Sequence, residues 1–461
     1  MMLGTIQAIL MPNWTQLGFD IDGEAADDRS GWSVSLNSDG TIVAIGAYFN
    51  DGAGSNAGHV RVYEWNSGTS AWDQKGADID GEAASDQSGY SISLSSDGSI
   101  LAIGAYLNDG GGTNVGHVRV YEYSGSSWSQ IGADIDGGAG EDNSGASVSL
   151  SSDGTIVAIG GGDDGSGSYA GFVRLYEYSG SSWSQMGADI DGEATGDQSG
   201  WSVSLSSDGS IVAIGSRKND DAGTNAGHVR VYEWNSGTSS WDQKGANIEG
   251  EAAYDLSGTT GTVSLSSDGS IVAIGGYLND GAGNAAGHVR VYEYSGSSWS
   301  QIGADIDGEA TGDQSGWSVS LSSDGSIVAI GAVGNDDAGS NAGHVRVYEY
   351  SGGSWSQKGA DIDGEAAGDA FGIGVSLSSD GSDVAVGAYF NASTGTKAGH
   401  VRVYSFSSDV LQKIIADNDY VNGAAIVHVS RLPNVPKTRL SQTINDNTGI
   451  DNISEILSTR F

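Results

Sequence analysis

Five loops of the chain carry acidic residues at one recurring spacing, and carboxylates spaced in this way could bind a hard cation. Calcium takes roughly six to eight oxygen ligands, and carboxylates placed around a glycine turn can supply several of them. The spacing therefore predicts divalent-cation binding by these loops, most naturally of calcium. The acidic side chains occupy positions 1, 3, 5 and 9 of each loop: Asp20, Asp22, Glu24, Asp28; Asp78, Asp80, Glu82, Asp86; Asp189, Asp191, Glu193, Asp197; Asp305, Asp307, Glu309, Asp313; and Asp361, Asp363, Glu365, Asp369.

Two further loops break this spacing and are expected to bind a cation most weakly. Gly138 replaces the glutamate at position 5 of one loop, and Asn247 opens the other. A second interpretation explains all seven loops without a metal, because solvated carboxylates keep a repetitive protein soluble and monomeric. The sequence leaves both interpretations open.

Histidine and arginine form a second recurring pattern, and we expect its role to be structural. Each histidine occurs once per repeat, so in a closed ring the histidines would lie far apart and could not share one ion. We expect them to pack between repeats, and we expect the arginines, including Arg174 beside Phe172, to pair with neighbouring carboxylates. The pairs are His59 and Arg61, His117 and Arg119, His228 and Arg230, His288 and Arg290, His344 and Arg346, and His400 and Arg402.

A repeated unit of about 57 residues positions these side chains, and this length is typical of propeller blades. Each unit passes through an acidic loop, an alternating stretch such as SVSLSSDG, an apolar run such as IVAIGA, and the sequence GHVRVYE. Alternation indicates strands, and Ser-Asp-Gly is a tight-turn signal. Seven units of four strands predict an all-β fold, a seven-bladed β-propeller over residues 12–406. The units begin at Trp14, Trp72, Trp128, Trp183, Trp241, Trp299 and Trp355.

The strand count also predicts how the ring closes. Seven sets of three strands follow the seven tryptophans, and the last set ends near Phe406 without a new tryptophan strand. We therefore expect residues 12–21, around Trp14, to supply the outer strand of the last blade. This N-terminal strand would close the propeller and cover its exposed edge.

The composition excludes several classes of partner. The formal net charge of −40 argues against nucleic-acid binding through a basic surface and against an anionic membrane. Cysteine is absent, so disulfides and thiolate sites are impossible. No apolar run approaches the ~18 residues of a membrane span. The first residues lack the basic start and cleavage site of a signal peptide, so we expect none.

The order of motifs resembles the FG-GAP repeat of the integrin alpha-chain propeller. Phe371-Gly372 is a literal Phe-Gly pair, and Gly46-Ala47-Tyr48 stands where that family has Gly-Ala-Pro. Six of the seven units carry Ser-Gly instead of Phe-Gly, and the proline is missing throughout. The resemblance implies a non-catalytic adhesion or ligand-binding propeller, often with calcium in its loops. The acidic spacing is similar to the integrin calcium loop, although here the loop precedes the Phe-Gly position.

Residues 407–461 break the repeat and have a different composition. They contain Pro433 and Pro436 and apolar stretches such as VLQKIIA and AAIVHV. This C-terminal extension is interpreted as an attachment or oligomerisation segment, through which the propeller could assemble. A disordered tail explains the same composition equally well.

The sequence favours a protein that is not an enzyme. The Ser-Asp-Gly turns lack the spacing of a sialidase Asp-box, and no cluster of catalytic residues stands outside the repeat. We expect an adhesion or ligand-recognition propeller on a cell or virus surface, with a protein or glycan ligand on the face that carries the acidic loops. The alternative is a structural scaffold of a virus particle or surface layer. A virion protein would be extracellular without a signal peptide, because it is released by lysis.

Overall fold

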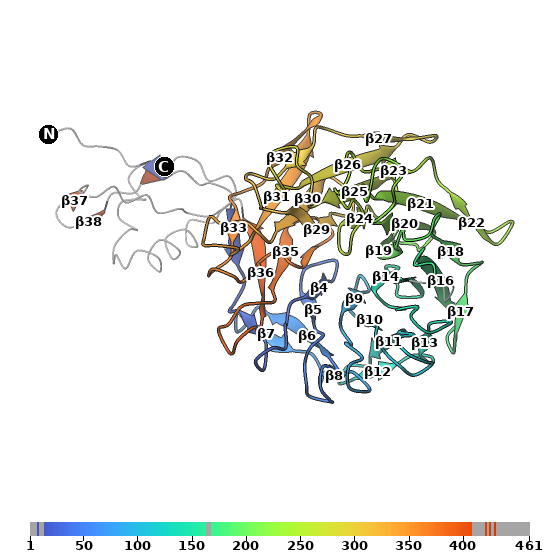
Figure 1. The fold of residues 1–461 in the computed structure, drawn as a ribbon. Coiled ribbons are helices and arrows are strands. Elements are labelled where there is room, and N and C mark those ends of the chain that lie inside the picture. The colour runs from blue at the N-terminus through green and yellow to red at the C-terminus, as the bar shows by residue number, and fades with distance from the viewer. Residues whose placement is uncertain are drawn as a thin grey trace. The chain divides into compact units, whose positions relative to one another are not determined.

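The computed structural model describes residues 7–8, 13–162, 167–407, 420–421, 424–425 and 428–429. Throughout this described part of the chain the regular structure consists of β-strands, and no helix is present. The chain divides into one unit of residues 16–405 and a second unit of residues 1–15 and 406–461. The larger unit is a ring of seven four-stranded blades, which confirms the predicted all-β propeller (Figure 1).

Each blade is an antiparallel sheet whose strands follow one another from the axis outward. The first strands are β4 (Ser33–Leu36), β9 (Ser91–Leu94), β14 (Ser147–Leu150), β19 (Ser199–Leu205), β24 (Val263–Leu265), β29 (Ser315–Leu321) and β34 (Val375–Leu377). The second strands are β5 (Ile42–Ala47), β10 (Ile100–Ala105), β15 (Ile156–Gly161), β20 (Ile211–Ser216), β25 (Ile271–Gly276), β30 (Ile327–Ala332) and β35 (Asp383–Ala388). The third strands are β6 (His59–Asn66), β11 (His117–Tyr123), β16 (Phe172–Tyr178), β21 (His228–Asn235), β26 (His288–Tyr294), β31 (His344–Ser351) and β36 (His400–Ser407).

The outer strand of each blade is formed in two short pieces that both pair with the third strand. In blades one to six they are β7 (Ala71–Gln74) and β8 (Ile79–Asp80), β12 (Trp128–Gln130) and β13 (Ile135–Asp136), β17 (Trp183–Gln185) and β18 (Ile190–Asp191), β22 (Ser240–Gln243) and β23 (Ile248–Glu249), β27 (Trp299–Gln301) and β28 (Ile306–Asp307), and β32 (Ser354–Gln357) and β33 (Ile362–Asp363).

The last blade takes its outer strand from the start of the chain, as predicted. Strands β2 (Asn13–Gln16) and β3 (Ile21–Asp22) both pair with β36, and Ile21 stands opposite Val401. The rings of Trp14 and Phe406 lie 5.2 Å apart. The ring is therefore closed by hydrogen bonds between the two ends of the repeat region.

Four short strands complete the described residues. Strand β1 (Gln7–Ala8) pairs in parallel with β39 (His428–Val429), and β37 (Tyr420–Val421) pairs with β38 (Ala424–Ala425). The rest of 408–461 lies outside the described residues. The predicted attachment role of this C-terminal segment therefore stays a prediction.

The core lies between neighbouring blades, which explains why the second strands are apolar on both faces. One representative cluster joins Ala102 and Val118 of blade two to Val148 and Ile159 of blade three. These side chains are at most 8% exposed. A sheet covered on both faces needs apolar residues on both, and the IVAIG run supplies them.

Two sets of hydrogen bonds join each blade to the next. Around the axis, a serine hydroxyl of one first strand accepts the backbone N–H of a leucine in the next, as in Ser35 to Leu94 at 3.0 Å. The contact of Leu36 with Ser376 at 2.9 Å completes this circle. Farther out, a tryptophan Nε1 donates to a backbone oxygen of the preceding blade, as from Trp72 to Leu17 at 2.9 Å. The repeated serines and tryptophans therefore build the ring.

The Ser-Asp-Gly segments form the tight turns between first and second strands. Asp97 accepts hydrogen bonds from the backbone N–H and the hydroxyl of Ser99, at 2.9 and 2.7 Å, and from the hydroxyl of Ser95 at 2.8 Å. Burial alone would raise the pKa of Asp97, but these hydrogen bonds outweigh it and the pKa lies below its ordinary value. The aspartates of these turns therefore do the structural work that the sequence predicts.

Candidate functional site

The acidic loops and the loops between second and third strands meet at one end of the ring, which we call the acidic face. The carboxylate at position 9 of an acidic loop holds the two loops together. Asp28 accepts hydrogen bonds from the backbone N–H of Ala25 and from Asn50 Nδ2, at 3.0 and 3.1 Å. The same bond to an asparagine is made by Asp86, Asp197, Asp255, Asp313 and Asp369.

The other carboxylates of one loop face two different blades. Asp20, at position 1, lies 3.6 Å from Nδ1 of His400 in the last blade. Glu24, at position 5, lies 3.9 Å from Nδ1 of His59 in the first blade. One loop therefore divides its predicted metal ligands between two neighbouring histidines. The cation-binding prediction itself stays a prediction for all twenty residues.

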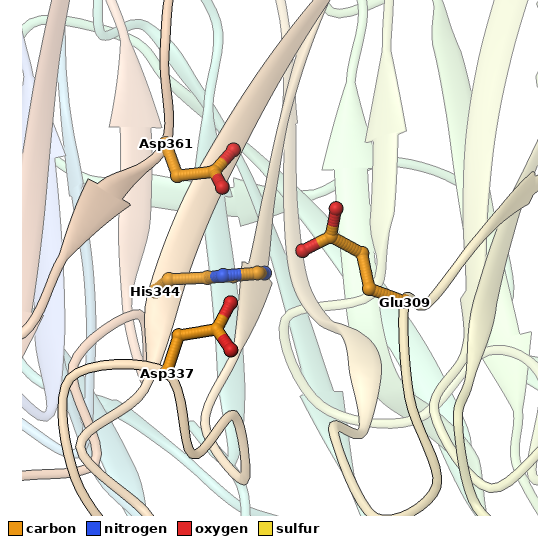
Figure 2. Close-up of side chains that lie close together, drawn as sticks. All are labelled: Glu309, Asp337, His344 and Asp361. Atoms are coloured by element: carbon orange, nitrogen blue, oxygen red, sulfur yellow. The ribbon is translucent and has the colours of Figure 1, made fainter.

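The histidine that begins a third strand and carboxylates of the surrounding loops form what we call an inter-blade pocket. In each group the ligand atoms lie within 4.8 Å of one another. Figure 2 shows the group in blade six, where three carboxylates surround the imidazole of His344. The described groups include Glu24, His59, Asp78; Glu82, His117, Asp134; Glu193, Asp221, His228; Glu309, Asp337, His344, Asp361; and Asp20, Asp22, His400.

The pocket histidines are buried and neutral at pH 7. Burial, and after it the charge of the neighbouring arginine, lower the pKa of His59, His228 and His288 to about 4. Burial also lowers the pKa of His117 and His344. A neutral imidazole in these pockets keeps a lone pair that can accept a proton or a metal ion.

Five of the arginines donate to a backbone oxygen of the preceding blade, whereas Arg174 pairs with a carboxylate of its own blade, and the ion pairs confirm the predicted pairing with carboxylates. Arg61 Nη2 donates to the backbone oxygen of Asp22 at 2.6 Å, and its Nη1 lies 3.7 Å from Glu24. In blade three Arg174 pairs with Asp189 at 2.8 Å and lies over the ring of Phe172, 4.0 Å from its centre. These ion pairs tie the acidic loops to the strands beneath them.

A cavity of about 400 Å³ opens on the ring axis, at the end of the first strands that lies on the acidic face. All seven blades contribute to its lining. Its polar groups include Arg217 and the hydroxyls of Thr259 and Thr260, and its aromatic groups include Trp32 and Trp317. We call this space the axial cavity.

Two positions of each repeat, which we call the rim slots, differ strongly from blade to blade, and eight of their fourteen residues line the axial cavity. The slot before the first strand holds Trp32, Tyr90, Ala146, Trp201, Thr259, Trp317 and Ile373 in blades one to seven. The slot after the second strand holds Tyr48, Tyr106, Gly162, Arg217, Tyr277, Val333 and Tyr389.

The aromatic residues around the cavity form two separate groups. Trp32 contacts Tyr90 with ring centres 5.5 Å apart and Tyr389 at 5.3 Å, which places one group over blades one, two and seven. Tyr277 and Trp317, 4.7 Å apart, form the second group over blades five and six. Aromatic rings at these distances hold each other in fixed orientations.

A third position of each repeat also varies in sequence, and its side chain contacts residues of the rim slots in blades one and four. The backbone at this position is left-handed in every blade. Its φ is 56° at Arg29 and 54° at Gln198, although side chains disfavour this region. Arg29 donates to the hydroxyl of Tyr48 at 2.7 Å. Gln198 accepts a hydrogen bond of 2.7 Å from Arg217, whose guanidinium lies 4.1 Å from the centre of the Trp201 ring. Side chains at these strained positions therefore position the rim residues.

Comparison with known proteins identifies the repeat. Residues 21–63, 189–232 and 305–348 match the FG-GAP repeat. The chain carries FG-GAP repeats. No curated protein matches it. One matching solved structure is named “putative 6-phosphogluconolactonase”, from Bacteroides uniformis ATCC 8492, at 12% identity and a TM-score of 0.49, over 73% of this chain and 86% of that one. In the described residues, no helix is long and apolar enough to cross a membrane.

The Phe-Gly position of the FG-GAP repeats lies at the joint between blades. Phe371 bridges Gly343 of the preceding blade and is fully buried. In the other repeats a serine makes the same bridge, as Ser88 does with Gly58. A Cβ atom on Gly58 would lie 2.2 Å from the backbone oxygen of Ser88, so this joint requires glycine.

The sequence reasoning above missed the axial cavity altogether. The predicted sites consist of residues that recur, whereas the cavity lining combines recurring first-strand residues with positions that differ between repeats. The available signal was the difference between aligned repeats. The twelve residues SLSSDGSIVAIG are identical in three repeats, yet the second residue after them is Arg217, Tyr277 or Val333.

Proposed function

We propose that this FG-GAP propeller is a non-enzymatic recognition protein of a cell or virus surface, and that it binds a neutral glycan in the axial cavity. The divergence of the cavity slots within an otherwise near-identical repeat carries this proposal. A ring of equal blades presents a seven-fold symmetric surface. A single small ligand needs different groups on different sides, and the rim slots provide them around the cavity.

The chemistry of the lining favours a sugar. Trp32, Tyr90, Tyr277 and Trp317 are half-buried, so part of each ring remains accessible. Flat aromatic faces bury the apolar faces of sugar rings, while guanidinium and hydroxyl groups bond to sugar hydroxyls. A volume of about 400 Å³ is within the range of small-molecule sites. The acidic loops around it disfavour anionic sugars.

The lining also favours binding over catalysis. The described residues that line the cavity include arginine, tyrosine, tryptophan, serine and threonine, but none with a carboxylate or an imidazole. Those two groups carry most general acid–base chemistry at neutral pH. The resemblance of the repeats to adhesion propellers supports the same assignment, and it supports a location outside the cell.

A glycan array tests this function. Fluorescently labelled full-length protein should be retained by a defined class of neutral glycans. Trp317→Ile should reduce retention at least tenfold, and because blade seven carries Ile373 in the same slot, the fold should tolerate it. Asn37→Ser, at the opposite end of the axis where the other blades carry serine, is the matched control and should bind like the wild type.

Two results would reject the proposal. Retention that Trp317→Ile leaves unchanged would place the binding site elsewhere. Failure of every neutral glycan, together with retention of basic peptides, would show that the carboxylates of the acidic face bind a protein partner instead. The scaffold alternative predicts neither result, and instead predicts that truncation after Ser407 abolishes assembly into a particle.

A further inference from the structure

The inter-blade pocket of blade six brings together one histidine and three carboxylates. Its four side chains come from separate segments of the chain. Glu309 lies in the acidic loop before β29, and Asp337 lies in the loop between β30 and β31. His344 begins β31, and Asp361 lies between β32 and β33. One potential ligand atom from each lies within 4.8 Å of the other three.

His344 is the buried member of this group of four side chains. Its side chain is fully buried, and neither of its ring nitrogens has a hydrogen-bond partner. A buried polar group without a partner is costly, and such groups in native proteins commonly mark an absent ion or water. Figure 2 shows the imidazole lying between Asp337 and Asp361, with Glu309 facing it from the neighbouring blade. The unsatisfied nitrogens are therefore surrounded by carboxylate oxygens.

We propose that Glu309, Asp337, His344 and Asp361 bind a divalent transition-metal ion of the zinc class. Zinc accepts imidazole nitrogen and carboxylate oxygen together at about 2.0–2.2 Å, whereas calcium selects oxygen ligands alone. This site differs from the calcium prediction of the sequence in its ligands. It takes one carboxylate from each of two successive acidic loops, a third from another loop, and its nitrogen from a strand.

The four side chains can bind such an ion through small side-chain rotations, without a change in the backbone. Ligand atoms about 2.1 Å from one metal lie roughly 3.4–4.2 Å apart, slightly closer than the 4.8 Å limit observed. Glu309 and Asp337 are exposed and free to turn by this small amount. One oxygen of Glu309 lies 3.3 Å from Arg346, which leaves its other oxygen for the ion.

Comparison of the repeats shows that only blade six has the complete set. The slot of Asp337 holds Gly52, Gly110 and Gly281 in blades one, two and five and Ser393 in blade seven. Blade four has Asp221, but Asn247 replaces the carboxylate of Asp361 there. Blade three has Phe172 in place of the histidine. In blade four Glu249, 3.9 Å from Nδ1 of His228, is a carboxylate at a different position of the loop. The other pockets therefore lack at least one of the four positions that blade six fills, and we expect weaker binding there.

The natural differences between blades supply well-matched variants for a test. His344→Phe introduces the residue that blade three buries at this position, and Asp337→Gly introduces the residue of blades one, two and five. Titration calorimetry of the full chain with zinc chloride alone should show one site tighter than the rest. His344→Phe should abolish that site and Asp337→Gly should weaken it at least tenfold. Melting curves in chelator should confirm that both variants fold.

The visible absorption spectrum of bound Co²⁺ reports which ligand atoms hold the metal. Co²⁺ bound to the wild type should give visible absorption bands of a nitrogen–oxygen site, and His344→Phe should lose them. An excess of calcium should not displace zinc from this site. The assignment is overturned if the wild type has no tight zinc site, if His344→Phe leaves it unchanged, or if calcium displaces the zinc.

Discussion

The inter-blade pockets and the axial cavity lie on the same face of the ring, yet their residues differ in how often they recur between repeats. The histidine–arginine pair of the pocket recurs in six of the seven repeats. The residues around the cavity include tryptophan, tyrosine, alanine, threonine and isoleucine in one slot alone. Repetition marks the positions that build the ring, because each joint between blades has the same geometry. Divergence marks positions around the axial cavity, where we propose that a ligand binds.

Blade three shows what the pocket requires for folding. Phe172 fills the histidine position and is fully buried, and Arg174 lies over its ring and pairs with Asp189. An aromatic side chain of similar size therefore suffices for the joint. Packing at this joint therefore does not by itself require an imidazole.

The largest expected effect comes from breaking the ring. Deletion of residues 1–22 removes β2 and β3 and leaves the outer edge of β36, the third strand of the last blade, unpaired. An unpaired edge strand templates association, and the blade also loses the burial of Ile21 and Trp14. We expect self-association or misfolding, measured by light scattering and circular dichroism. A monomeric deletion variant with an unchanged melting temperature would contradict the closure.

The next effect concerns the pocket histidines and pH. The pKa of His288 is about 4 in the folded chain against an ordinary 6.5, so below pH 6.5 the unfolded chain takes up a proton that the folded chain excludes. The stability is therefore complete above pH 6.5 and is lost as the pH falls toward 4. At pH 5 the loss is about 2 kcal/mol for each such histidine.

His288→Phe tests this pH dependence and sharpens the contrast with blade three. Urea unfolding at pH 7 and pH 5 should show a smaller loss of stability on acidification in the variant than in the wild type. Phe172→Tyr, which adds no group that titrates in this range, is a control that should retain the wild-type loss. An equal loss in His288→Phe and wild type would show that the histidines do not carry the effect.

The sequence predicted the fold well because propeller geometry is repeated seven times. The tryptophan spacing, the Ser-Asp-Gly turns and the orphan strand at Trp14 are local signals, and each is confirmed. The grouping of carboxylates around a histidine could not be predicted from the sequence. Glu24 and Asp78 belong to different loops and meet only when two blades pack around His59. The axial cavity depends likewise on which ends of seven first strands converge.

A smaller effect is expected from calcium. The acidic loops repel one another, so a bound cation should stabilise the folded chain by mass action. Thermal unfolding with millimolar calcium should give a higher midpoint than unfolding in chelator, at matched ionic strength. An unchanged midpoint would reject calcium binding by the loops and favour the interpretation that their carboxylates serve solubility alone.

The central claim is that the divergent rim serves recognition while the repeated joints serve the ring, and one triple variant tests it most directly. Trp32→Ala, Arg217→Val and Trp317→Ile place in each slot a residue that another blade already carries there. Urea unfolding and glycan retention should be measured in parallel on this variant and the wild type. The account predicts an unfolding free energy within about 1–2 kcal/mol of wild type together with loss of binding. Retained binding, or unfolding as severe as that of the strand deletion, would contradict it.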